Sequence, residues 1–70
     1  MGKRTTGVVR AYDASKGYGY IDSEDGQQVF VHTSALDRNG PALLSPGERV
    51  IFFLENTVRG FEAADVTRQN

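Results

Sequence analysis

Short stretches of alternating apolar and polar residues, separated by turn-forming residues, make up most of this chain. A period of two is typical of β-strands that bury one face. No stretch keeps the 3.6-residue period of a helix over the roughly ten residues that a helix needs. The pattern therefore predicts five strands, over residues 6–12, 18–22, 28–32, 49–55 and 61–68.

Turn-forming residues mark the breaks between the predicted strands. Asp25 and Gly26 predict a tight hairpin between the second and third strands, in a type I′ turn with positive φ at both residues. Residues 33–36 predict one helical turn. The glycines and prolines of residues 37–47 predict a long loop, and residues 56–60 turn the chain before the last strand.

Five strands with no helix between them predict an antiparallel sheet. A parallel connection needs a crossover, usually a helix, and the pattern contains none. Closing the sheet removes its exposed edges, so we expect an all-β fold, a five-stranded antiparallel barrel. With 70 residues the chain has the length of one domain, residues 1–70, with its core over about residues 5–68.

Alternation along a strand assigns each side chain to an inner or an outer face. The apolar positions of the second and third strands would face the core, opposite those of the fourth strand. The six residues expected in the core are Ile21, Val29, Val31, Val50, Phe52 and Leu54.

The outer face of the second and third strands then carries four ring-bearing side chains, Tyr18, Tyr20, Phe30 and His32. Rings are costly to leave bare, and exposed π faces are what unstacked bases bind. The alternative, in which these rings fill the core, would turn three β-formers to solvent. A lone histidine is also often just a capped polar residue with no binding role. The pattern favours a platform for unpaired bases.

Charge and composition exclude several other classes of function. The chain has no cysteine and one histidine, so we expect no disulfide, metal site or cofactor. No apolar run approaches the roughly 20 residues that span a bilayer, and no secretory signal is visible. We therefore expect a soluble, cytoplasmic monomer. The net charge of -1 argues against a duplex-binding surface and favours stacking on unpaired bases.

Candidates for catalysis are weak. Asp22, Glu24 and Asp25 flank the predicted hairpin turn. Solvent-exposed charges at the tip of a hairpin are a simpler interpretation of them than a catalytic acid and base. The serines have only His32 as a possible base, and no third group completes a triad. We therefore do not expect an enzyme.

Two motifs resemble the RNA-binding motifs of the bacterial cold-shock protein family. Residues 16–21 (KGYGYI) place a lysine and glycines around alternating aromatics, and residues 29–32 (VFVH) resemble the second motif. The resemblance extends from about Thr6 to Thr67. It implies a five-stranded barrel of OB-fold type, single-stranded RNA or DNA as ligand, and a role in keeping RNA unfolded at low temperature, as an RNA chaperone or regulator of gene expression.

The resemblance also implies binding roles for particular residues. The four outer-face rings would stack bases, and Tyr12 would support them from behind. Arg10 and Lys16 would contact the nucleic-acid backbone, and Arg59 would reach the ligand from the loop before the last strand. Arg10 and Lys16 can also be explained as ordinary solvated charges. For Arg10 this explanation is as well supported as a role in binding. The implied set is Arg10, Tyr12, Lys16, Tyr18, Tyr20, Phe30, His32 and Arg59.

Three positions depart from the aromatic set that is usual in the family. Ala11 stands where a tryptophan is usual, Thr33 where a phenylalanine follows the histidine, and Pro41 where the long loop often has an aromatic. We therefore expect up to three stacking surfaces to be missing. Tyrosines replace the usual phenylalanines at positions 18 and 20, and each adds a hydroxyl that can hydrogen-bond.

Two other classes of binding protein are alternatives. An aromatic surface also suits a protein interface, so a protein-interaction OB barrel with weak or no nucleic-acid binding stays open. An RRM domain shares the aromatic motifs, but it needs two helices between strands, and this chain has neither the length nor the periodicity for them.

Overall fold

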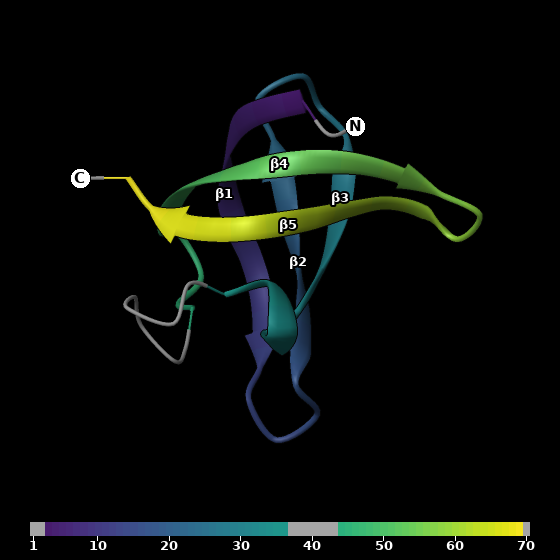
Figure 1. Cartoon of the computed structure of the whole chain (residues 1–70). Helices are drawn as coiled ribbons and strands as arrows, with labels where there is room; N and C mark the ends of the chain where they lie inside the picture. Colours follow the sequence, from purple (N-terminus) through teal and green to yellow (C-terminus); the bar gives the residue numbers. More distant parts are fainter. Residues whose placement is uncertain (1–2, 37–43, 70) are drawn as a thin grey trace.

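A computed structural model describes residues 3–36 and 44–69 (Figure 1). Within these residues the elements, in chain order, are β1 (Lys3–Asp13), β2 (Tyr18–Ser23), β3 (Gln28–His32), the 3-10 turn η1 (Thr33–Ala35), β4 (Arg49–Thr57) and β5 (Gly60–Arg68). All five predicted strands are therefore present. The predicted loop over residues 37–47 lies mostly outside the described residues.

β1 is longer than predicted because its two halves pair with different strands. Its first half, from Lys3 to Val8, pairs with β4, and its second half pairs with β2. Polar residues at the start of β1 hid this pairing from an analysis of alternation alone. The pairing of β4 with β1 closes the sheet into a barrel with the strand order β1-β2-β3-β5-β4.

One neighbouring pair of strands, β3 and β5, is parallel, with Phe30 opposite Glu62. The prediction of a barrel that is antiparallel throughout is wrong at this pair. Strand directions can alternate around a closed ring only if the number of strands is even, so a five-stranded barrel must contain a parallel pair. No helix is needed for this crossover, because β4 itself returns the chain between β3 and β5; in Figure 1 the β4–β5 hairpin lies across the other strands.

The core follows the predicted alternation. Five of the six predicted core residues are at most 1% exposed: Ile21, Val29, Val31, Val50 and Phe52. Leu54 is only half-buried and packs against this cluster. The core also contains Val9, Leu44, Ala63 and Val66, which the analysis of the sequence had not assigned to it.

A β-bulge at Arg10 interrupts the alternation of β1. Val9 pairs with Ile21, whereas Ala11 pairs with Tyr20, so Arg10 is the extra residue. Both Arg10 and Ala11 are exposed as a result, and the half-buried Tyr12 packs against the core. The bulge therefore turns Ala11 to the outer face, on the side of Tyr20.

Gly19 allows β1 and β2 to approach closely beside the bulge. A Cβ atom at Gly19 would lie 2.6 Å from the Cα of Tyr12 and would collide with the carbonyl oxygen of Ala11. It would also lie 2.9 Å from Cδ1 of the Tyr12 ring, which covers the glycine. Glycine weakens a strand, and an aromatic ring that packs over it from the neighbouring strand offsets this loss of stability.

The hairpin between β2 and β3 is present, but its turn type differs from the prediction. The Gly26 N–H donates to the Ser23 carbonyl oxygen at 2.9 Å, so Glu24 and Asp25 are the central residues of the turn. Gly26 has a φ of 88°, and Asp25 is not among the residues with positive φ. A turn whose fourth residue is this left-handed glycine gives the hairpin one more loop residue than a type I′ turn would.

We expect Val31→Ala to lower the free energy of unfolding by about 1–3 kcal/mol, because it leaves a cavity beside fully buried neighbours. The melting midpoint of a domain this small falls by about 4–8 °C for each kcal/mol lost. Val8→Ala is the matched control, since Val8 is 40% exposed on the outside of β1. A loss for Val8→Ala equal to that for Val31→Ala would contradict the assignment of the two faces.

Candidate nucleic-acid interface

Three aromatic rings contact one another on the outer face of β2 and β3. The ring centroids of Tyr18 and Phe30 lie 5.6 Å apart at an interplanar angle of 32°. Tyr20 meets Phe30 edge-on at 5.9 Å and Tyr18 edge-on at 6.4 Å. These separations are in the range of attractive aromatic pairs. All three side chains are half-buried, so each keeps part of its ring surface open to solvent.

Strand register arranges the outer-face residues in two rows across the barrel. The first row is Asp13–Tyr18–His32, and the second is Ala11–Tyr20–Phe30–Glu62. The three rings and His32, hereafter the ring platform, therefore lie together in these two rows. The first row ends on Asp13 and His32, and the second ends on Ala11 and Glu62.

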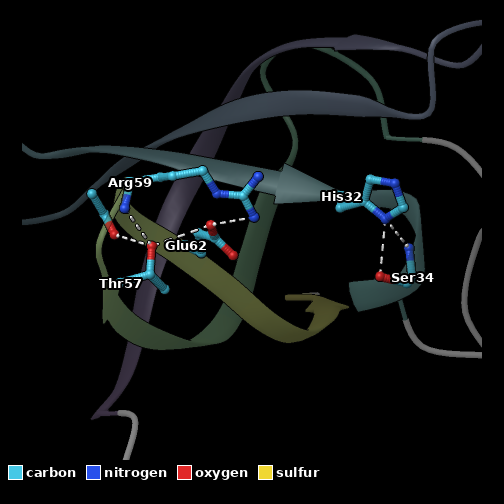
Figure 2. Close-up of polar contacts among 6 residues, drawn as sticks. His32, Ser34, Thr57, Arg59 and Glu62 are labelled. Atoms are coloured by element: carbon cyan, nitrogen blue, oxygen red, sulfur yellow. Dashed lines mark hydrogen bonds and ion pairs between the residues drawn. The ribbon is translucent and has the colours of Figure 1, made fainter.

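His32 lies at the exposed end of β3 and has a defined orientation. Its Nδ1 accepts the Ser34 backbone N–H at 3.2 Å and lies 2.9 Å from the Ser34 Oγ (Figure 2). Because Nδ1 accepts a backbone N–H, the neutral ring carries its proton on Nε2. His32 thus caps η1, a structural role that the sequence had not indicated, and it stays exposed beside Tyr18.

A turn that is held together by Asp13 presents Lys16 at the edge of the ring platform. The Asp13 carboxylate accepts the Ser15 hydroxyl at 2.6 Å and the backbone N–H groups of Ser15 and Lys16. The Ser15 hydroxyl lowers the pKa of the Asp13 carboxyl most, and these N–H groups and the Lys16 charge add to it, against the opposing effect of desolvation. Lys16 lines a surface hollow of about 250 Å³ together with Ala11, Tyr12, Tyr18 and Tyr20.

Arg59 lies near the other end of the ring platform, on the β4–β5 hairpin. Its Nη2 is 3.4 Å from Oε2 of Glu62, and Thr57 Oγ1 lies 3.2 Å from the same oxygen (Figure 2). A second hollow, of about 170 Å³, is lined by Tyr20, Phe30, Arg59 and Glu62. Sequence analysis missed Glu62, because only the parallel pairing of β3 with β5 brings it beside Phe30.

Arg10, like His32, is a predicted site residue that lines neither of these hollows. Its guanidinium Nε lies 3.1 Å from Oδ2 of Asp22 on β2, and both side chains are largely exposed. An exposed ion pair of this kind is weak, so a phosphate can compete with Asp22 for Arg10. Thr33 is also exposed, at the start of η1, whereas Pro41 lies outside the described residues.

The acidic residues at the β2–β3 turn have local partners. Asp22 pairs with Arg10, Glu24 accepts the Thr6 hydroxyl at 2.6 Å, and Asp25 accepts the Ser23 hydroxyl. Over residues 3–36 and 44–69 there is no group of three side chains that could hold a metal ion, and no helix long and apolar enough to cross a membrane. Asp22 and Glu24 therefore connect the hairpin to β1, and Asp25 has its partner within the hairpin.

A closed five-stranded barrel with an aromatic outer face defines an OB-type binding module. Comparison with family models matches residues 5–69 to the "cold-shock" DNA-binding domain. The chain belongs to the cold-shock domain family, whose members bind nucleic acid and are not enzymes. The resemblance read from the two motifs is therefore confirmed.

Individual relatives match over nearly their whole length. The chain is 46% identical over 63 residues to cold shock protein 1 of Lactiplantibacillus plantarum, covering 90% of this chain and 96% of the relative. It is 42% identical over 62 residues to the major cold shock protein of Streptococcus pyogenes, covering 89% and 92%. Cold shock protein CspC of Bacillus subtilis is also 42% identical over 62 residues, covering 89% and 94%.

A solved structure shares the fold. A chain of the Drosophila protein described as Unr CSD456 superposes with a TM-score of 0.78 at 17% identity. The match covers 99% of this chain but 28% of that longer chain. At this identity the likeness supports the barrel fold alone, so the binding residues must be argued from this chain.

We expect Ser15→Ala to raise the pKa of the Asp13 carboxyl towards its ordinary value, because the hydroxyl that stabilises the carboxylate is lost. The side-chain carboxyl resonance of Asp13, followed by NMR through a pH titration, measures this directly. A depressed pKa makes the turn's contribution to stability complete above the unfolded pKa, and the contribution is lost as pH falls through the folded pKa. Ser34→Ala, in η1, is the control and should leave the Asp13 midpoint where it is.

Proposed function

We propose that this protein binds single-stranded RNA or DNA by stacking successive bases on Tyr18, Tyr20, Phe30 and His32. The observation that carries the proposal is the contact between three half-exposed rings on one outer face of the barrel. Stacking on such rings is worth about 1–3 kcal/mol per base and tolerates any base, because every base has a π face. A base in a duplex has no free face to offer, so the ligand is single-stranded.

Three cations and one tyrosine assist the ring platform in this proposal. Lys16 and Arg59 line the two hollows beside the rings, within reach of a strand that stacks on them. Arg10 reaches a phosphate after leaving Asp22, and Tyr12 supports the sheet behind the rings by covering Gly19. With a net charge of -1, stacking supplies more of the affinity than phosphate contacts do.

The missing aromatics set the expected strength of binding. Ala11 is exposed directly opposite Tyr20, and Thr33 is exposed beside His32, so neither position contributes a ring to the outer face. Fewer stacks mean weaker and more rapidly reversible binding. Such binding suits a single-domain, monomeric RNA chaperone or regulator of gene expression in the cytoplasm, which must hold RNA unpaired without trapping it. The names of the bacterial relatives support this role.

We expect a pyrimidine-rich single strand to bind much more tightly than the duplex of the same sequence, because only the single strand exposes base faces. Tyrosine fluorescence reports the titration, since the chain has no tryptophan. Each neutralised phosphate of a single strand contributes about 0.7 to the slope of log affinity against log salt, so three cations give a slope of about -2 or shallower.

Equal affinity for single strand and duplex, or a slope steeper than about -4, would contradict binding through the ring platform. If the chain bound neither form, the surface would instead fit the protein-interaction barrel considered above. These outcomes are distinguished within one set of titrations at two salt concentrations.

We expect Phe30→Ala to weaken binding of a single strand by about 5- to 150-fold, because Phe30 contacts both tyrosines at the centre of the ring platform. Its partly exposed, outward position predicts that the barrel stays folded. Phe53→Ala is the matched control: Phe53 is 38% exposed on β4, opposite Arg4 and Ala64. Binding curves and thermal melts of both variants are needed, and equal losses of affinity would count against the proposed surface.

A further inference from the structure

The hollow between β3 and the β4–β5 hairpin has an aromatic floor and a charged wall. Its lining residues are Tyr20, Phe30, Arg59 and Glu62. Glu62 stands directly opposite Phe30 in the parallel pair, so its side chain shares the outer face with the Phe30 ring. Under the proposed function a base stacks on this ring, and its hydrogen-bonding edge then meets whatever the wall offers.

The structural contacts of Glu62 involve only one of its two carboxylate oxygens within the described residues. Across β4–β5 its partner is Glu55, a like charge that destabilises a cross-strand pair. Its recorded contacts, to Arg59 and Thr57, both involve Oε2, and within the described residues no hydrogen bond engages Oε1. Its side chain is 24% exposed, whereas that of Arg59 is 79% exposed and can turn towards a ligand. Glu62 thus keeps acceptor capacity beside the stacking surface.

The donors and acceptors of this wall match one base better than the others. A carboxylate only accepts hydrogen bonds, and a guanidinium only donates them. The Watson–Crick edge of guanine presents two adjacent donors, N1–H and N2–H, beside the acceptor O6. Adenine and cytosine present one amino donor next to a ring-nitrogen acceptor, and uracil and thymine present one imino donor between two carbonyl oxygens.

We infer that Glu62 and Arg59 form a guanine-selecting subsite at Phe30. The Glu62 carboxylate accepts the N1–H and N2–H of a guanine that stacks on Phe30, and the Arg59 guanidinium donates to O6. Proteins that read single strands recognise splayed bases through their Watson–Crick edges in this way. The inference rests on the proposed function, because it requires a base on the ring platform, and it adds a sequence preference that stacking alone does not provide.

A single-strand titration with modified bases tests the subsite. The probe is an oligouridine of about seven nucleotides, within the site size of an OB fold, in which one uridine at a time is replaced by guanosine. A paired carboxylate contact to the correct base edge discriminates by about 5- to 150-fold, so the best guanosine position should bind at least about fivefold more tightly than oligouridine. Inosine, which lacks the N2 amino group, should lose most of this gain, and 7-deazaguanosine should retain it.

The variants separate the carboxylate from the charge. Glu62→Gln should abolish the preference for guanosine and leave affinity for oligouridine unchanged or higher. Glu55→Gln makes the same charge change on the opposite strand and should keep the preference, with affinities within about twofold of the unmodified protein. Thermal melts of both variants confirm that each is folded at the titration temperature.

The outcomes distinguish this inference from the function on which it rests. Oligouridine that binds without any gain from guanosine would overturn the subsite and leave the proposed function standing. A guanosine preference that survives Glu62→Gln, or that 7-deazaguanosine loses, would also overturn it, the latter because Arg59 would then be reading N7. If no single strand binds, the proposed function and the subsite fail together.

Discussion

Burial of Ile21, Val29 and Val31 inside the barrel determines where the rings of the platform point. Each of these side chains is fully buried, and a strand alternates its side chains between two faces. Tyr20 and Phe30 are therefore held on the outer face, although packing the rings inside would bury more apolar area. The hydrophobic core and the ring platform are two sides of the same two strands, so stability and binding depend on the same register.

The bulge at Arg10 and the close approach at Gly19 adapt β1 to this platform. The bulge turns Ala11 outward beside Tyr20, and the absence of a Cβ at Gly19 lets Tyr12 lie across β2. The position that extends the second row of the platform is therefore available for a ring but is occupied by a methyl group. Where a ring would stand at this position there is a shallow hollow, which is lined by Lys16 and three tyrosines.

The charges around the ring platform make it different from a purely electrostatic binding surface. Arg10 and Arg59 each have a carboxylate partner within 3.4 Å, and both arginine side chains are more than half exposed, so these ion pairs are weak. Under the proposed function, a strand that binds here gains stacking energy, and its phosphates replace carboxylates as partners of the two arginines. Under the further inference, the Glu62 carboxylate at the edge of the ring platform gives one base an advantage over the others.

The sequence by itself determined the strands, most of the core and the four platform side chains, because alternation within a strand is a local property. The sequence did not identify Ala63 and Val66 as core residues, because β5 contains a bulge and alanines and so lacks a clear alternation of apolar and polar residues. Alternation could not place Ala11 on the outer face, which only the family resemblance implied, because the bulge at Arg10 shifts it there. Tertiary structure alone decided that β3 and β5 are parallel and that Glu62 lies opposite Phe30. Ring closure with five strands imposes the parallel pair, and contacts between distant residues leave no periodic trace in the chain.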